Sequence, residues 1–180
     1  GKMNPAGGYM DMQWMSWTQL YPFVRSANIA IQKLTANEGG LEASLANRLL
    51  GEAHFMRGYL FSQLMRQYGG IVLLTEPLTL ESEASNPRAS FEATVSQIIS
   101  DLDKAIVLLA DAPQSKARAH KLTAHALKSR VLTHAASDLH DPVKNAAVST
   151  ISGYGSKELI GYTGGSQQAR WQAAQTLSLI

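Results

Sequence analysis

The sequence predicts an all-α fold of stacked antiparallel helix hairpins, with long irregular loops between some of the helices. Two observations predict it. Apolar residues recur at steps of three and four along several long segments, which is the spacing that gives a helix one buried stripe. Glycine pairs or an Asp-Pro step end these segments, and short connections within each pair of helices make successive helices antiparallel neighbours.

Start and stop signals place each helix along the chain. Ser90 stands at an N-cap position, and Glu92 lies in the first turn, where the helix dipole favours an anion. Residues 71–75 form an apolar run that is too short for a helix, so they predict an extended segment leading to Pro77. The expected helices cover residues 14–36, 41–68, 91–109, 122–139 and 169–180.

The helix pairs predict divergent tetratricopeptide-like repeats, although no clean repeat consensus is present. A weak echo of that consensus lies in Ala53, Tyr59 and Phe61, and in an alanine-rich set on the fourth helix. Residues 142–168 lose the periodicity and are rich in glycine, serine and threonine, which predicts an irregular or poorly ordered loop. We expect residues 1–180 to form a single helical domain and to be a fragment of a longer chain, because the last helical pattern continues to the final residue.

The composition is that of a globular protein, and it argues against several classes of partner and site. The formal net charge is only +2, which gives no field for binding a phosphate backbone and disfavours nucleic acid as a partner. The chain has no cysteine, so disulfides, thiolate metal sites and a cysteine nucleophile are excluded. No apolar run approaches the roughly 20 residues that cross a bilayer, and the first residues do not form a signal sequence.

Several stretches, in order along the chain, resemble the SusD/RagB family. The match is centred on residues 48–61 (RLLGEAHFMRGYLF), which continue through Leu64 to residues 68–74 (YGGIVLL). The further pieces are Trp17, Tyr21 and Ala27-Asn28; Pro87-Arg88-Ala89-Ser90 leading to residues 98–106; residues 118–132; and, after a variable loop, residues 171–174.

This resemblance implies a mostly helical, tetratricopeptide-containing lipoprotein of Bacteroidetes that lies on the outer membrane and takes part in polysaccharide utilisation. Such a protein binds oligosaccharides or polysaccharides as nutrients and delivers them to a SusC-like TonB-dependent transporter. It is not an enzyme and needs no cofactor. Its membrane contact would be a lipid anchor, and neither the acylated cysteine nor the C-terminal half of the family is in this sequence.

Aromatic side chains are the first candidates for contact with a glycan, because their faces stack on the apolar faces of sugars. Tyr9 and Trp14 lie near the first helix, with Arg25 further along it, and Tyr154 and Tyr162 lie in the 142–168 loop. We expect these five residues to be the ligand-binding candidates. A helical-repeat scaffold that binds another protein, without a ligand site of its own, is the alternative.

Other notable residues have a structural interpretation. Trp17 and Tyr21 lie on the apolar stripe of the first helix and are expected in the core, and Asn28 is expected to be a buried amide bonded to nearby backbone. Sequence spacing also allows two pairs across a helix turn, Arg48 with Glu52 and Asp101 with Lys104.

Metal, phosphate and hydrolytic sites are not indicated. The five histidines lack the spacing that places two zinc ligands on one helix face, so no metal is expected. The glycine pairs are not followed by Gly-Lys-Ser/Thr and are interpreted as turns. A glycosidase needs two facing carboxylates, and no convincing second one accompanies Glu52.

Overall fold

The computed structural model describes residues 15–78, 86–111, 115, 117–148 and 152–177. All regular structure in these residues is helical, so the all-α prediction is confirmed. The elements are α1 (Trp17–Ala36), α2 (Ala43–Tyr68), α3 (Phe91–Leu108), α4 (Lys121–Ala136), a 3-10 turn η2 (Asp138–His140), α5 (Pro142–Ala146), a second 3-10 turn η3 (Lys157–Leu159) and α7 (Gln167–Leu177).

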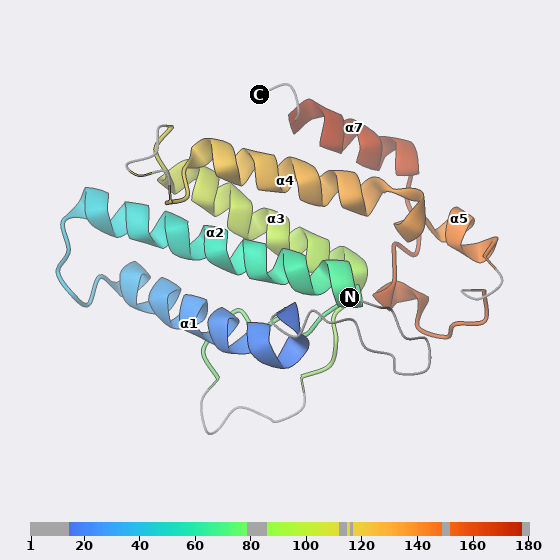
Figure 1. The fold of residues 1–180 in the computed structure, drawn as a ribbon, viewed down its shortest axis with the longest axis horizontal. Helices are drawn as coiled ribbons and strands as arrows, with labels where there is room; N and C mark the ends of the chain where they lie inside the picture. Colours follow the sequence, from blue (N-terminus) through green and yellow to red (C-terminus); the bar gives the residue numbers. More distant parts are fainter. Residues whose placement is uncertain (1–14, 79–85, 112–114, 116, 149–151, 178–180) are drawn as a thin grey trace.

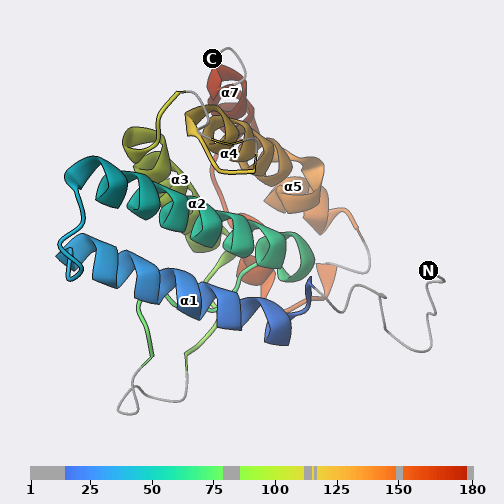
Figure 2. The same cartoon turned by 60° about the vertical axis from the view of Figure 1, so that its left-hand side comes forward.

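The long helices form a stack in which each packs on its neighbour in the sequence. α2 packs against α1 on one side and α3 on the other, and α4 packs against α3 and α7. The chain direction reverses from each of these helices to the next, and α1 and α7 lie at opposite sides of the stack (Figures 1 and 2). The predicted stacked antiparallel hairpins are therefore confirmed.

The helix boundaries follow from local capping. The Ser90 hydroxyl accepts a hydrogen bond from the Ala93 amide at 3.1 Å, which confirms the predicted N-cap of α3. The Glu42 carboxylate accepts from the first amides of α2, and this cap explains why the helix begins two residues after the predicted start. At the C-terminal end of α1, Asn37 adopts the left-handed conformation with φ 47°.

The core lies where α1, α2, α3 and α4 meet. Trp17 and Tyr21 are half-buried and pack against this core, as predicted, with their ring centroids 4.8 Å apart. Its largest fully buried side chains are Phe61, Phe91, Leu64, Met65, Ile71, Ile98, Leu102 and Val24.

The chain leaves α2 through two glycines that are closely packed. A Cβ atom on Gly70 would lie 2.1 Å from the carbonyl oxygen of Ala89, and one on Gly69 would lie 2.0 Å from that of Leu159. Gly69 also has φ 73°, a conformation that favours glycine. The glycines thus let α2 end against two backbone segments. Residues 71–75, the extended segment of the prediction, form no helix, contain a tight turn in which the Leu74 amide donates to the Val72 carbonyl at 3.2 Å, and bury Ile71.

The structure contains helices in residues 142–168, where the periodicity predicts none. α5 begins at Pro142 and is capped by the Asp141 carboxylate, which accepts from the Val143 and Lys144 amides. Elements this short cannot display an apolar stripe, so periodicity cannot detect them. α4 ends at Ala136, before the predicted residue 139, because the chain tightens there into η2.

Candidate functional site

A polar groove lies between α1 and α3, with α2 as its floor. Its volume is about 840 Å³, within the range of small-molecule sites. We call it the α1–α3 groove; it is lined by Asn28, Ile31, Gln32, Thr35, Ala36, His54, Arg57, Thr75, Glu76, Pro77, Gln97 and Lys104.

A buried ion pair forms the floor of this groove. The Arg57 guanidinium donates to both carboxylate oxygens of Asp101, Nε to Oδ2 at 2.9 Å and Nη2 to Oδ1 at 2.6 Å. The side chains of the pair are only 4% and 0% exposed. Two further donors complete the shell of the carboxylate, His54 Nδ1 at 2.9 Å and Gln97 Nε2 at 3.2 Å. Every strong polar group at this depth therefore has a partner, as buried charges require.

The titration of Asp101 reflects this environment. Burial by itself would raise the pKa of the Asp101 carboxyl. Hydrogen bonds from His54 and Arg57, together with the charge of Arg57, outweigh it, and the pKa lies below its ordinary value. Asp101 is thus ionised at neutral pH and serves as the counter-ion of Arg57.

The same network ties the extended segment to the helices. Arg57 Nη1 donates to Asn28 Oδ1 at 2.9 Å and to the Thr75 carbonyl at 2.8 Å. Asn28 Nδ2 donates to the carbonyls of Leu74 at 2.8 Å and Glu76 at 3.1 Å. The prediction of a buried amide bonded to backbone is confirmed, and its function is to fix one wall of the groove.

The predicted pair of Asp101 with Lys104 is wrong. Asp101 points into the buried network and is saturated there by Arg57 and His54. Lys104 instead is exposed on the groove wall, and no ion pair joins it to any residue in the described ranges. A donor that the sequence assigned to local pairing is therefore available to a ligand.

The groove can form hydrogen bonds with the hydroxyl groups of a ligand, but its described lining residues have no aromatic surface on which a sugar ring could stack. Gln32, Glu76 and Lys104 are exposed on its walls and supply amide, carboxylate and ammonium groups. No Phe, Tyr or Trp side chain occurs among the lining residues in the described part of the chain.

The structure does not gather the sequence-predicted ligand residues into one site. Tyr9 and Trp14 lie outside the described residues. Arg25 is exposed on α1, Tyr154 is 43% exposed in the loop after α5, and neither lines the pockets that contain Tyr162.

Tyr162 is packed against its neighbours. Its ring meets Phe91 edge-on, with the centroids 5.5 Å apart, and the Arg170 guanidinium lies 4.3 Å above the ring centroid. Burial raises the pKa of its hydroxyl. The ring thus anchors α7 and the loop before it to α3, with only part of its surface left for a ligand.

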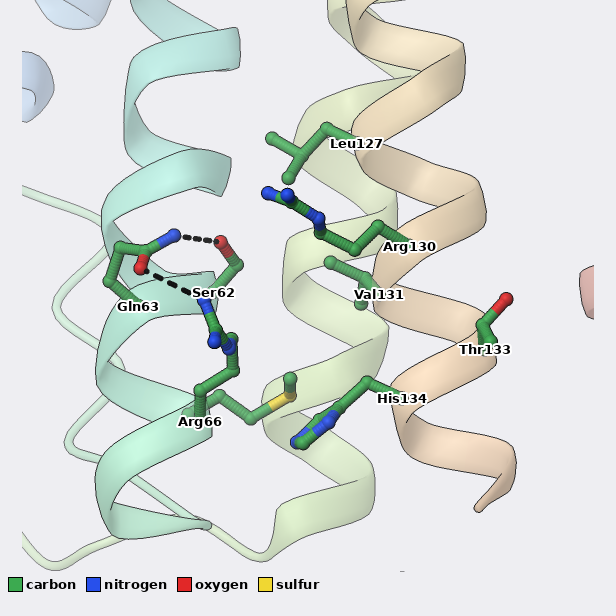
Figure 3. Close-up of a pocket in the computed structure, with 9 residues that line it drawn as sticks. Ser62, Gln63, Arg66, Leu127, Arg130, Val131, Thr133 and His134 are labelled. Carbon is green, nitrogen blue, oxygen red and sulfur yellow. Dashed lines mark hydrogen bonds between the residues drawn. The ribbon is translucent and has the colours of Figure 1, made fainter.

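A second concave feature, which the sequence did not indicate, lies between α2 and α4, with α3 behind it in the view of Figure 3. We call it the α2–α4 cleft, and its volume is about 390 Å³. Its lining residues are Ser62, Gln63, Met65, Arg66, Leu127, Arg130, Val131, Thr133 and His134. The sequence contains no signal for this cleft, because its residues come from α2 and α4, which are separated by α3 in the chain.

The described residues contain no candidate metal site, and Glu52, the carboxylate considered for hydrolysis, is held in ion pairs. These residues contain no group of three or more histidine, cysteine, aspartate or glutamate side chains that could hold a metal ion. The predicted pair of Glu52 with Arg48 is confirmed at 3.4 Å, and Arg118 adds a two-pronged contact at 2.9 and 2.6 Å. Glu52 is thereby held as a counter-ion.

None of the helices in the described ranges is both long enough and apolar enough to cross a membrane.

Comparison with known proteins finds several similar proteins that are all described as SusD-like. A SusD-like protein of Bacteroides fragilis has a similar structure, with a TM-score of 0.60 and 30% identity over 76% of this chain and 31% of that chain. A laminarin-binding SusD-like protein is 27% identical, with a TM-score of 0.62, over 68% of this chain and 26% of its own. SusD-like protein P25 of Formosa agariphila is 27% identical over 135 residues, which are 72% of this chain and 25% of that protein.

This chain therefore spans only about a quarter to a third of the length of these relatives. The family model described as starch-binding and associating with the outer membrane matches residues 7–132, well over half of the chain. The chain belongs to the SusD-like family.

Proposed function

We propose that the protein of which this chain is a part captures an oligosaccharide or polysaccharide at the bacterial surface and delivers it to a SusC-like TonB-dependent transporter. The observation that carries the proposal is membership of a family described as starch-binding and associated with the outer membrane. A relative that binds laminarin supports a glycan as ligand. A lipid anchor on the parent chain would hold the protein at the outer membrane.

The α1–α3 groove supports this function because its walls are polar and its floor is rigid. The network of Arg57, Asp101 and Asn28 joins three helices and the extended segment, so the groove is fixed before a ligand arrives. A preformed site loses less conformational entropy on binding. We propose that Gln32 and Lys104 donate to sugar hydroxyls and that aromatic residues outside the groove supply stacking.

Capture without hydrolysis agrees with the carboxylates around the groove. A glycosidase needs two carboxyl groups that face each other across the scissile bond, about 5 to 10 Å apart. Glu76 is the one exposed carboxylate among the lining residues, and Asp101 is occupied by Arg57 beneath them. The described residues around the groove therefore offer no acid and base pair.

Affinity gel electrophoresis of the intact parent protein against neutral plant, fungal and host polysaccharides tests the proposal. We expect one glycan to retard the protein. The double variant Gln32→Ala/Lys104→Ala should weaken retardation if the groove binds the glycan, and Trp14→Ala should weaken it if the predicted aromatic residue contributes. Lys33→Ala is the matched control, because Lys33 is exposed on α1 beside Gln32 but does not line the groove.

Three other outcomes would contradict parts of the proposal. Retardation that survives both variants would move the binding site to another part of the parent chain. Hydrolysis of the retained glycan would contradict capture without catalysis. No retardation by any glycan, combined with retained binding to the transporter, would favour the protein-binding scaffold.

A further inference from the structure

Two exposed arginines face the α2–α4 cleft from opposite sides. Arg66 comes from α2 and Arg130 from α4; the Arg130 guanidinium reaches into the space between the two helices, and that of Arg66 lies along α2 at the edge of the cleft (Figure 3). The one hydrogen bond found for Arg66 within the described ranges is long, with Nη1 donating to Gln63 Oε1 at 3.4 Å. No ion pair joins either arginine to a carboxylate in the described ranges.

This arrangement differs from that of most other arginines in the described residues. Arg48, Arg57, Arg118 and Arg170 pair with carboxylates, and Arg88 donates to the backbone carbonyls of Gly70 and Tyr68. A fork of donors matches the planar oxygens of a carboxylate or the oxygens of a sulfate. Two such forks line the α2–α4 cleft, and no carboxylate in the described ranges forms an ion pair with either of them.

The rest of the cleft suits a sugar ring. Met65, Leu127 and Val131 give it an apolar floor, against which the C–H face of a ring could lie. Gln63 is buried on α2, where its amide bonds to Ser62 and Arg66 and helps to position the Arg66 side chain, whereas Thr133 points away from the cleft (Figure 3). The volume of about 390 Å³ is at the small end of ligand sites, as a subsite for one sugar unit would be.

The positive charge of Arg66 acts on His134, which also lines the cleft. His134 lies on the α4 side, and its pKa is lowered first by burial and then by the charge of Arg66. The ring is therefore neutral at physiological pH, so the two guanidinium groups are the charges that an anion would meet.

We propose that the α2–α4 cleft is a subsite for an acidic sugar residue, whose carboxylate or sulfate group binds between Arg66 and Arg130. The inference rests on the proposed glycan capture and adds the chemical class of one sugar unit. The ring would lie on the apolar floor. An acidic peptide segment of another protein would also bind the two arginines, but it would contact less of so short an apolar floor than a sugar ring would.

Matched pairs of polymers test this subsite on the intact parent protein. We would measure affinity for polygalacturonate against its methyl-esterified form, and for a sulfated galactan against its desulfated form. In Arg66→Gln/Arg130→Gln, we expect binding of at least one acidic polymer to fall about tenfold or more, with binding of neutral glycans unchanged. The polymer that loses affinity identifies the anion as carboxylate or sulfate.

Two further variants separate a built site from general attraction. Lys33→Gln/Lys144→Gln removes the same charge from exposed positions outside the cleft, and it should lower affinity for the acidic polymers less than twofold. Arg66→Lys/Arg130→Lys keeps the charge but not the fork, and it should restore only part of the affinity. Unchanged thermal unfolding of each variant would establish that the fold is intact.

The remaining outcomes would overturn the subsite. Equal losses in the arginine and lysine double variants would mean non-specific attraction. Arginine-dependent binding of polyglutamate without binding of any acidic glycan would assign the cleft to a protein partner. If neutral glycans bind and acidic ones do not, the subsite fails while the proposed glycan capture stands. If no glycan binds, both fail.

Discussion

Two arginines on the same helix, α2, meet opposite environments. Arg57 is 4% exposed and bonded to Asp101, Asn28 and the Thr75 carbonyl, whereas Arg66 is exposed and has no carboxylate partner in the described ranges. Removing one member of a buried pair leaves an uncompensated charge, while an exposed cation is already solvated. The comparison teaches that the α1–α3 groove floor holds the fold together, and that the arginines of the α2–α4 cleft contribute little to folding.

The largest expected effect comes from breaking the buried pair. Arg57→Met would leave Asp101 as a buried carboxylate with only His54 and Gln97 as donors. We expect the free energy of unfolding of the intact parent protein to fall by about 3 to 5 kcal/mol, measured by chemical denaturation. In Arg57→Met/Asp101→Leu the charge is gone as well, so the loss should be smaller than the sum of the two single variants. A loss below about 1 kcal/mol in Arg57→Met would contradict the structural role of the pair.

A second buried polar group lies beside the cleft and makes stability depend on pH. His140 Nδ1 donates to the Ile160 carbonyl at 2.7 Å, so its Nε2 accepts from His134 Nε2 at 3.1 Å. Burial is the main reason why the pKa of His140 is lowered from 6.5 to about 4. The ring, stacked on Phe91 at 4.1 Å, is therefore kept neutral.

The sign of the pH effect follows from proton linkage. Between pH 6.5 and 4 the unfolded chain binds a proton at this histidine that the folded protein does not, so stability falls as the pH falls through that window. We expect the loss to reach about 2 kcal/mol after allowing for partial solvent access. His140→Asn should flatten the slope of unfolding free energy against pH in this window. An unchanged slope would assign the effect to other groups, of which His134 is the first to test.

Sequence reasoning located the elements better than the contacts between them. The periodic segments, the Ser90 cap and the buried Asn28 are local features, and the structure confirms them. Periodicity could not detect α5, which has one turn of helix and no stripe. The pairing of Asp101 with Lys104 was predicted from the sequence because the only available guide was their spacing along one helix.

The candidate sites depend on contacts between residues far apart in the sequence. The α1–α3 groove combines three helices and an extended segment, and the α2–α4 cleft combines two helices that are not consecutive. No spacing rule connects such residues before the fold is known. The aromatic candidates Tyr9 and Trp14 remain predictions, since they lie outside the described residues.

A smaller effect is expected where the groove wall is held by a neutral hydrogen bond. The Tyr21 hydroxyl donates to the Val72 carbonyl at 2.7 Å and joins α1 to the extended segment. Tyr21→Phe keeps the ring in the core but loses this bond, so unfolding free energy should fall by about 1 kcal/mol. Tyr154→Phe, at a 43% exposed position, is the control and should change it by less. Equal denaturation midpoints for both variants would mean that the bond contributes nothing to stability.

The smallest effect should come from the arginines of the α2–α4 cleft. Both side chains are exposed and have no carboxylate partner in the described ranges, so Arg66→Gln/Arg130→Gln should change the unfolding free energy by no more than about 0.5 kcal/mol. The same denaturation measurement as for Arg57→Met makes the two arginine positions on α2 directly comparable. A loss above about 2 kcal/mol would mean that the arginines pair with carboxylates elsewhere in the parent chain, and they would then be structural like Arg57. Unchanged stability together with lost binding of an acidic glycan would separate a ligand site from a folding element on the same helix.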